Sequence, residues 1–500
     1  MQKSPDSVIE LDVKIDEGRP FFSRFFCALS PCISGFKGVC RPFLSVDSTA
    51  PNGRWNGHLC CATGVDGHNW MYLVAYGFFE AENTENWTWF FHQLHKVVGD
   101  LPLLALCSDA CKGLNNAMNN VFPYAEKWEC FRHLIQNYIK QFGGSEYMYP
   151  AARAYRREVF DHFFSSIQEI PRVSSWLNEH HDCLWYRSGF NTDIKCDYVT
   201  NNIAEVFNNW IKDWKDLPVC DLADRIREEI MEMFHRRRIA QKLQGRILPL
   251  VLHILHARTR CLGHLSVRKA DNYIAEVRDN NDVHSKHIVN AQLRECSCKE
   301  WQHTGKPCIH ALCLITAQEF RDVRMEDFVD DYYSVAHFTT TYSRVVPPVG
   351  DKSFWPEVPF PKEVGAPIGK RAVGRQRKNR IKGCLEGGSG KKKVNNDNGK
   401  KSIRDKFKCP NCGELGHRKA SYECPLNGTK KRKRKPRKNS TKGWFPKDVP
   451  ESSQPVDHEN EDVVAMIPAI EDVVERPSSP PEERVVRVLV KKITPRKKNV

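Results

Sequence analysis

Between residues 58 and 79 the chain contains two apolar runs around a turn signal: His58-Leu59-Cys60-Cys61-Ala62-Thr63-Gly64, then Asp66-Gly67-His68-Asn69, then Met71-Tyr72-Leu73-Val74-Ala75-Tyr76-Gly77-Phe78-Phe79. Asp-Gly between such runs is a strong signal for a β-hairpin. We therefore expect two antiparallel strands that meet near Asp66, which takes the ordinary role of a turn residue.

Segments on both sides extend this hairpin into a larger sheet. From residue 42 onward we expect strand, strand, strand, helix, strand, helix, and a strand that runs into a helix. The corresponding segments are Pro42–Val46, His58–Gly64, Met71–Phe79, Glu85–Val98, Leu101–Cys107, Gly113–Phe122 and Trp128–Ile139. A hairpin followed by alternating strands and helices predicts an α/β fold in which helices cover a mixed sheet.

The segments that follow are mainly helical. Tyr149–Trp185 is a largely helical insertion, and Leu222–Leu243 is a long amphipathic helix. Between them, Thr200-Asn201-Asn202 offers a helix start. The helix after it carries an apolar stripe on one face, formed by Ile203, Phe207, Trp210, Ile211 and Trp214.

Two aspartates stand at the ends of expected strands. Asp47 follows Pro42–Val46, and Asp109 follows Leu101–Cys107. An open α/β sheet places its ligands at strand ends, and paired carboxylates suit Mg²⁺ or Mn²⁺. A third acid from a helix would complete a two-metal clamp for attack on a phosphodiester. Taken singly, each aspartate is more often a turn or cap residue.

Seven segments, in this order, carry a family signature: Phe43-Leu44-Ser45-Val46-Asp47-Ser48-Thr49, Ala62-Thr63-Gly64-Val65-Asp66-Gly67-His68-Asn69, Ala75-Tyr76-Gly77, Glu82-Asn83-Thr84-Glu85-Asn86-Trp87-Thr88-Trp89-Phe90, Cys107-Ser108-Asp109-Ala110-Cys111-Lys112-Gly113, Cys130-Phe131-Arg132-His133-Leu134 and Thr200-Asn201-Asn202-Ile203-Ala204-Glu205-Val206-Phe207-Asn208. Together they resemble Mutator-like element transposases, the plant MuDR family. The resemblance implies an RNase H-like catalytic core with a DDE triad. On that pattern Asp47 is the first acid, Asp109 the second and Glu205 the third.

The neighbours of the triad differ from the usual family pattern. Asp47-Ser48-Thr49-Ala50 stands where the family often has Asp-Gly-Thr-His, and Ser108-Asp109-Ala110 stands where it often has Ser-Asp-Arg. On a helical wheel Glu205 lies opposite the apolar stripe. We therefore expect Glu205 to reach the aspartates only if the stripe packs on the insertion Tyr149–Trp185. Cys130 and His133 form a Cys-x-x-His pair, and two ligands alone do not make a zinc site.

Four residues further along have the spacing of a zinc site, Cys296-x-Cys298 followed by Cys308-x-His310. Three thiolates and one imidazole suit tetrahedral Zn²⁺. We expect a strand before them at Asn290–Leu293 and a helix after them at Ala311–Ala317. With Trp301 and Gly305-Lys306-Pro307 in the loop, the segment resembles the SWIM-type zinc finger. DNA and protein both stay open as its partner.

A second zinc pattern consists of Cys409, Cys412, His417 and Cys424. It resembles the retroviral-type zinc knuckle, although its last spacing is longer than usual. Basic flanks and Phe407 favour nucleic acid, including RNA or single strands; a degenerate knuckle is the alternative. The basic run that follows is typical of a nuclear localisation signal or a phosphate-binding patch: Lys430, Lys431, Arg432, Lys433, Arg434, Lys435, Arg437 and Lys438.

Charge separates the body of the chain from its tail. The net charge is +15, but Ala366–Lys447 alone has 27 Lys/Arg against 5 Asp/Glu, which gives +22 and leaves −7 for the rest. Such a cationic segment predicts nucleic acid as a partner, with a merely solubilising tail as the alternative. The 20 cysteines, with no apolar signal sequence at the start, indicate a reducing compartment and metal sites. No apolar run is long enough to predict a membrane span.

The expected organisation begins with an N-terminal remnant at 1–40. The core at 41–215 has its helical insertion at about 149–195, and a helical region at 216–270 follows. The remaining parts are a SWIM finger at 271–325, a Pro-rich and basic linker at 326–400, a knuckle at 401–428, and a basic patch with a disordered tail at 429–500. The oligomeric state does not follow from the sequence.

Two classes of function are compatible with these features. The first is a metal-dependent DDE transposase that cuts and joins DNA strands in the nucleus. The second is a domesticated or decayed relative without catalysis, which binds DNA or chromatin through its zinc fingers and basic tail. Only about 45 residues precede Asp47, so we expect the amino-terminal DNA-recognition region of the family to be missing.

Overall fold

The computed structural model divides into two compact units, residues 1–385 and 386–500. It describes residues 4–53, 55, 57–109, 111–239, 243–282, 285–317, 324–351, 353, 364–367, 409–413 and 424–426. The acidic site and the first zinc pattern therefore lie in the first unit, and three cysteines of the second zinc pattern lie in the second.

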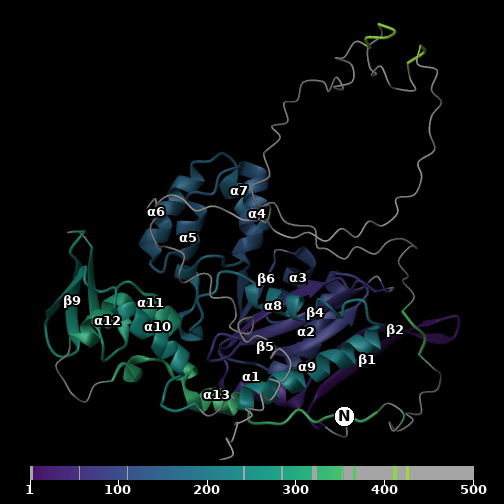
Figure 1. Ribbon diagram of the computed structural model, residues 1–500, viewed down its shortest axis with the longest axis horizontal. Helices are drawn as coiled ribbons and strands as arrows, with labels where there is room; N and C mark the ends of the chain where they lie inside the picture. Colours follow the sequence, from purple (N-terminus) through teal and green to yellow (C-terminus); the bar gives the residue numbers. More distant parts are fainter. Residues whose placement is uncertain are drawn as a thin grey trace, which may run out of the picture. The chain divides into compact units, whose positions relative to one another are not determined.

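A seven-stranded mixed sheet is the base of the first unit (Figure 1). Its strands are β1 Val8–Asp16, β2 Arg19–Ala28, β3 Phe43–Thr49, β4 His58–Val65, β5 Met71–Phe79, β6 Ala105–Ser108 and β7 Glu126–Glu129, in the order β1-β2-β5-β4-β3-β6-β7. Neighbours from β1 to β3 pair antiparallel, whereas β6 is parallel to both β3 and β7. The predicted hairpin around Asp66 is β4–β5, and the predicted mixed α/β fold is confirmed.

The sheet begins earlier than the sequence analysis placed it. β1 and β2 form a hairpin that turns at Glu17 and Gly18, both with positive φ. β2 then pairs with β5, and helix α1, Ser30–Val39, leads into β3. The expected remnant at 1–40 is therefore wrong, because this segment completes the core sheet. β1 lies at the sheet edge and Ile15 on it is 68% exposed, so it lacks the continuous apolar pattern of a buried strand.

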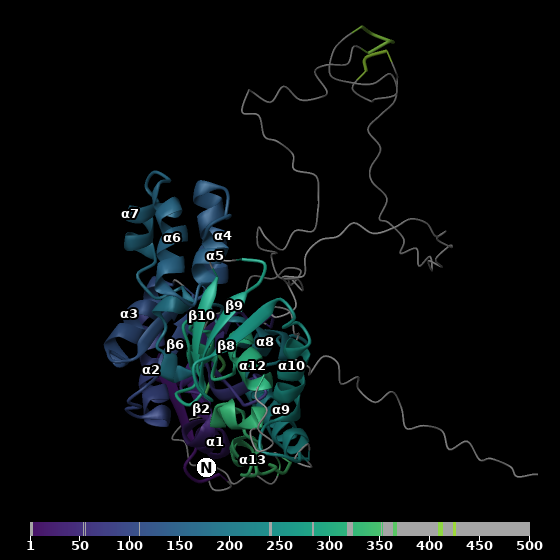
Figure 2. The ribbon, with the colours of Figure 1, turned by 90° about the vertical axis from the view of Figure 1, so that its left-hand side faces the viewer.

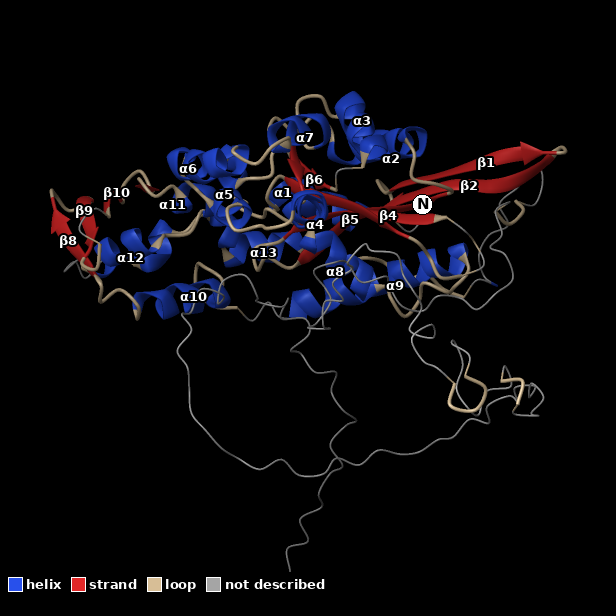
Figure 3. Cartoon of the chain, turned by 90° about the horizontal axis from the view of Figure 1, so that it is seen from above, coloured by secondary structure: helices blue, strands red, loops and turns tan. Residues whose placement is uncertain are grey.

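Helices cover both faces of this sheet (Figure 3). α2, Thr84–Val98, and α3, Lys112–Val121, lie on one face, and α8, Asn202–Trp210, and α9, Val219–Ile239, lie on the other. α2 buries Trp87, Phe90, Phe91 and Leu94, as its spacing predicted. None of the described helices is both long enough and apolar enough to cross a bilayer.

The helical insertion follows β7 and stands as a group beyond the end of the sheet (Figures 1 and 2). It comprises α4 Phe131–Phe142, α5 Met148–Arg153, α6 Arg157–Gln168 and α7 Val173–His180, followed by 3-10 turns at Arg187–Gly189 and Thr192–Ile194. Trp128 of β7 stacks on Phe190, with ring centroids 3.8 Å apart. This stack fixes the return of the chain toward α8.

A second, four-stranded antiparallel sheet carries the first zinc pattern. Its elements, with their flanking helices, are α10 Pro249–Thr259, β8 Leu265–Lys269, β9 Ile274–Asp279, β10 Lys286–Asn290, β11 Glu295–Cys296, α11 Glu300–Thr304 and α12 Ile309–Thr316. The strand expected at Asn290–Leu293 is instead a turn, because the Asn290 side chain accepts from Leu293 N at 3.0 Å. The chain continues through 3-10 turns at Met325–Phe328 and Asp331–Tyr333 into α13, Val335–Thr341.

Candidate acidic site and zinc centre

Asp47 and Asp109 occupy equivalent positions on neighbouring strands. β3 and β6 are parallel, with Ser45 opposite Cys107, so each aspartate lies two residues beyond a paired position. Adjacent strands are about 4.8 Å apart, which brings the two side chains to the same edge of the sheet. The sequence analysis expected both aspartates at strand ends, and their use as a shared site stays a prediction.

Their electrostatics reflect this proximity. Burial raises the pKa of Asp47 from 3.8 to about 7, and the carboxylates of Asp109, Glu205 and Glu82 act in the same direction. Burial also raises the pKa of Asp109, with His133 opposing and Glu82 adding to the shift. Like charges close together disfavour joint ionisation. Both aspartates are therefore harder to ionise here than in water.

Glu205 lies on α8, near enough to Asp47 for its charge to help raise the pKa of that carboxyl group. Its Oε2 accepts from Arg132 of α4, and its Oε1 is buried with no hydrogen-bond partner among the residues described. The apolar stripe packs differently from the expectation: α8 crosses β3, β4 and β5, and buries Ile203 and Phe207 there rather than against the insertion. Because Glu205 lies opposite Ile203 and Phe207 on the helical wheel, the packing that the sequence analysis required for Glu205 to reach the aspartates is not the one observed.

Asn201 explains why α8 begins at this place. The sequence analysis identified it as a helix start, but its side chain makes no cap hydrogen bond. Instead, Asn201 is fully buried, its Nδ2 donates to Val46 O at 3.2 Å, and its Oδ1 accepts from Ser45 Oγ. Its backbone N–H also donates to Cys130 Sγ at 3.1 Å. One amide therefore fastens α8 to the strand that carries Asp47.

The sequence analysis did not identify two further residues that contact this site, Asn208 and Glu82. Asn208 donates through Nδ2 to Asp47 Oδ2 at 3.0 Å, and Glu82 accepts from Ser48 Oγ at 2.7 Å, with His58 nearby. Ser48 N also donates to Asp47 Oδ1 at 2.8 Å. The helical wheel held a signal for Asn208, because it lies one turn after Glu205 on the same flank.

Among the described residues, the three acids do not form a group whose ligand atoms all lie within 4.8 Å of one another, as the two cysteine groups do. Asp47, Asp109 and Glu205 supply carboxylate oxygens, which Mg²⁺ and Mn²⁺ prefer. Two acceptors at the site, Glu205 Oε1 and Asn208 Oδ1, are buried without a partner in the described part of the chain. Buried acceptors are normally satisfied, so these oxygens have ligand capacity to spare. Arg132 acts against binding, because its guanidinium already neutralises part of the Glu205 charge.

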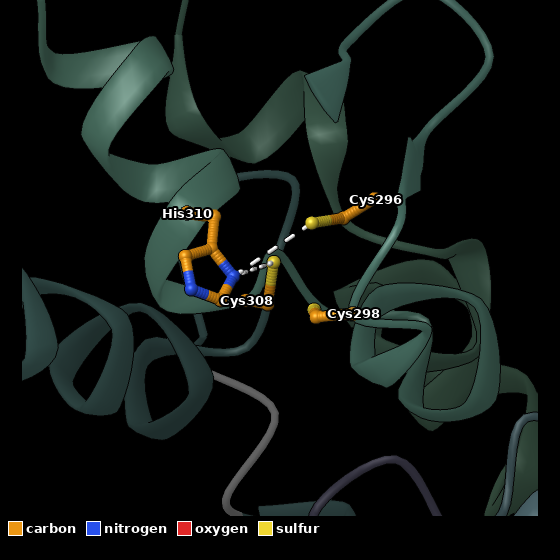
Figure 4. Close-up of side chains that lie close together, drawn as sticks. All are labelled: Cys296, Cys298, Cys308 and His310. Atoms are coloured by element: carbon orange, nitrogen blue, oxygen red, sulfur yellow. Dashed lines mark hydrogen bonds between the residues drawn. The ribbon is translucent and has the colours of Figure 1, made fainter. Parts of the chain in front are cut away.

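Cys296, Cys298, Cys308 and His310 come together as the zinc pattern predicts (Figure 4). Their ligand atoms all lie within 4.8 Å of one another. His310 turns Nδ1 toward the sulfurs, 3.7 Å from Cys296 Sγ and 3.9 Å from Cys308 Sγ. Three thiol groups and one imidazole around a common point are the donor set of a structural zinc site.

Local structure holds each zinc ligand in place. Cys296 ends β11, and Gln302 brackets its backbone, accepting from Cys296 N at 3.3 Å and donating to Cys296 O at 3.1 Å. Cys308 caps α12, its Sγ accepting from Ala311 N at 3.4 Å. Between them Gly305 has φ +70°, and an added Cβ would lie 2.8 Å from Asp330 Cβ. These contacts hold the two cysteines on either side of the loop in place.

Proton sharing among the thiols also suits a metal. Donation from Cys296 and then from Cys308 holds the pKa of Cys298 far below its usual range. The pKa of Cys296 is correspondingly raised to about 12 by its donation to Cys298. Zinc binds thiolates rather than thiols, so the cluster already stabilises one of the anions that zinc requires.

The second zinc pattern is described only in part. Cys409, Cys412 and Cys424 have ligand atoms within 4.8 Å of one another, and the sulfurs of Cys409 and Cys424 are 3.7 Å apart. His417 and the basic run Lys430–Lys438 lie outside the described residues. Within the described residues, Cys130 and His133 belong to no group of three possible metal ligands.

Comparisons with known proteins agree with this arrangement. Residues 43–137 match the MULE transposase domain, and residues 287–319 match the SWIM zinc finger. The chain is also similar to Protein FAR1-RELATED SEQUENCE 6 of Arabidopsis thaliana, with 25% identity over 116 residues. That similarity covers 23% of this chain and 16% of the Arabidopsis protein, so the chain matches about a sixth of the relative's length.

Proposed function

We propose that this chain, a MULE transposase-like protein with a SWIM zinc finger, is a nucleic-acid-binding protein whose acidic site cleaves and joins DNA strands. The observation that supports the proposal is the parallel register of β3 and β6, which brings Asp47 and Asp109 to the same edge of the sheet, with Glu205 exerting its charge on Asp47. Three acids contributed by two strands and one helix are the ligand set that a DDE transposase requires.

The strand order supports an RNase H-like core. Antiparallel β5, β4 and β3 are followed by parallel β6 and β7, and helices lie on both faces. Asp47 then lies on β3, the middle one of these five strands, and Asp109 directly follows β6, the parallel neighbour of β3. The third acid arrives from α8, after the insertion that contains α4 to α7.

The residues of the site have separate tasks in this proposal. Asp47, Asp109 and Glu205 would hold Mg²⁺ or Mn²⁺, and ions bound there supply activation of the attacking oxygen and stabilisation of the leaving oxygen. Ser48 N orients one oxygen of Asp47 through its hydrogen bond. Arg132 is placed to release Glu205 to a cation and to bind a phosphate of the DNA instead.

In this proposal the two zinc-binding modules and the basic tail form the surfaces that bind nucleic acid or protein partners. We propose two zinc ions, one at Cys296, Cys298, Cys308 and His310 and one at the knuckle. The knuckle is suited to single-stranded DNA or RNA, and the cationic segment to phosphates, so DNA binding should weaken as salt rises. The SWIM finger can also take a protein partner. The run Lys430–Lys438 supports a nuclear localisation.

A second candidate is a decayed or domesticated protein that binds nucleic acid without cutting it. The Arg132–Glu205 ion pair favours it, because a cationic side chain already occupies the third acid. In this case DNA binding would survive loss of the triad, and no divalent cation would bind at Asp47.

Strand cleavage by the purified full chain distinguishes the two candidates. The substrate is a plasmid carrying the genomic sequences on both sides of the coding region, supplied with Mn²⁺ or Mg²⁺. We expect nicking by the parent protein, loss of at least a hundredfold of the rate in Asp109→Asn, and no loss in Asp100→Asn, whose side chain is exposed. Equal cleavage by Asp109→Asn would reject the site. No cleavage by the parent, with DNA binding unchanged by Asp109→Asn, would favour the second candidate.

A further inference from the structure

His287 on β10 packs against one of the four residues of the first zinc pattern. Its imidazole ring lies on the ring of His310, with the centroids 3.9 Å apart and the ring planes at 31°. His287 does not belong to the group of four residues whose ligand atoms lie within 4.8 Å of one another. Any effect of His287 on a metal ion therefore acts through its neighbours.

The strand places His287 on the face of the sheet that is covered. Successive side chains of a strand point to opposite faces, so His287 shares a face with Val289, which is buried. Ile288 points the other way and is 58% exposed. Val289 is paired with Cys296 on β11, so the register of these two strands brings the His287 ring to the zinc pattern.

Ser297, which stands between the two cysteines of the Cys-x-Cys segment, holds the other side of the His287 ring. Its Oγ accepts from Ile288 N at 3.1 Å and shares a hydrogen bond with His287 Nδ1 at 3.2 Å. Its backbone N–H donates to Ile288 O at 2.9 Å. The ring is thus tied by its edge to the turn that carries two ligands, and its flat face contacts a third ligand.

We infer that His287 is a positioning residue of the zinc centre, which holds the ring plane of His310 so that Nδ1 stays directed at the thiol groups. The lone pair of a ring nitrogen lies in the ring plane, and the torsion that sets this plane in a histidine has only a broad preference of its own. Outer partners of metal-binding histidines commonly restrict this orientation. The inference rests on the proposed zinc ion at this site and adds a residue outside the four-residue pattern.

Competition with a chromogenic chelator measures the zinc affinity of the full chain. All variants carry Cys412→Ser, which removes a ligand of the second zinc pattern, and Cys308→Ser in this background gives the binding that remains without the first site. We expect His287→Ala to weaken zinc binding about tenfold. His253→Ala removes the same side chain from an exposed position on α10 and should leave the affinity unchanged.

His287→Phe separates the ring contact from the hydrogen bond. Phenylalanine keeps a flat ring beside His310 but has no nitrogen for Ser297, so a positioning role predicts that most of the zinc affinity returns. Cobalt(II) in place of zinc adds a spectroscopic signature. We expect shifted visible ligand-field bands in His287→Ala, which report a displaced imidazole, and an unchanged thiolate charge-transfer band.

The outcomes distinguish this inference from the zinc site on which it rests. Equal zinc affinity of His287→Ala and His253→Ala would overturn the inference, and so would a His287→Phe variant that binds as weakly as His287→Ala. If Cys308→Ser binds zinc as tightly as the parent background, the proposed zinc site fails instead. If His287→Ala does not fold, His287→Phe decides: parent-like affinity and cobalt bands support the inference, and weaker binding with shifted bands overturns it.

Discussion

Replacing Asp47 by Asn is expected to stabilise the metal-free protein at alkaline pH, although it removes a cation-binding carboxylate. Burial, assisted by Asp109, raises the pKa of Asp47 from 3.8 to about 7. The folded protein then keeps a proton that the unfolded chain has lost, so the free energy of unfolding falls as pH rises between these values. Asparagine does not ionise, so the free energy of unfolding of the Asp47→Asn variant should not fall with pH for this reason.

The two pKa values set the size of the effect. Ionisation of Asp47 lowers the free energy of unfolding by roughly 2 kcal/mol at pH 5 and by roughly 4 kcal/mol at pH 8. The free energy of unfolding of Asp47→Asn, relative to that of the parent, should therefore increase by about 2 to 3 kcal/mol from pH 5 to pH 8. Its hydrogen bonds persist, because Ser48 N can donate to the amide oxygen. Asn208 can turn its own amide to accept, since Oδ1 has no other partner among the described residues.

Urea unfolding at pH 5 and pH 8, without added divalent cation, measures the difference. Asp213→Asn is the control, because Asp213 is an exposed acid in the turn after α8, and it should follow the pH dependence of the parent. Added Mn²⁺ should stabilise the parent at pH 8 but not Asp47→Asn. An Asp47→Asn variant that loses stability from pH 5 to pH 8 as steeply as the parent would refute the buried-carboxylate argument.

Three further predictions follow from the same structure. Arg132→Gln should tighten Mn²⁺ binding to the full chain several-fold by freeing Glu205, as measured by the electron paramagnetic resonance signal of free Mn²⁺. Weaker binding would contradict the idea that Arg132 competes with the cation for Glu205. Cys308→Ser and Cys412→Ser should each lose one of two zinc ions per chain by elemental analysis, and a parent with one zinc would remove the knuckle site. Deleting Lys430–Lys438 should lower the nuclear fraction of a fluorescent fusion, and unchanged import would exclude this run as the signal.

Much of the architecture was accessible from local patterns. The β4–β5 hairpin followed from its Asp-Gly signal, and α2 from the spacing of its aromatic residues. The family resemblance to Mutator-like element transposases and to the SWIM finger is confirmed. Cys296, Cys298, Cys308 and His310 are close in sequence, so their convergence needs only one loop and one helix start. The catalytic roles of Asp47, Asp109 and Glu205 stay predictions.

The remaining features depend on long-range packing that no local pattern encodes. Asn201 reads as a helix cap in sequence, but its partner, the backbone at Val46, lies 155 residues away. The helical wheel placed Glu205 opposite an apolar stripe, but it could not show that this stripe packs on β3, β4 and β5. The β1–β2 hairpin did have a local signal, since Leu11, Val13 and Ile15 alternate with charged residues before Glu17-Gly18. Because β1 is an edge strand, it carries fewer apolar residues than a buried strand, and the sequence analysis did not assign it to the sheet.

One buried residue, Tyr333, connects the loop between the zinc-pattern cysteines to the segment before β3. Tyr333 donates to Thr304 O in the zinc loop at 2.7 Å and accepts from Arg41 at 3.2 Å, while Lys306 lies over its ring at 5.1 Å. Arg41 stands just before β3, the strand of Asp47. A loop ordered by zinc thus contacts the start of the strand that carries the first acid. Because metal binding supplies folding free energy to its loop, the SWIM segment is better described as part of the core's packing than as a tethered finger.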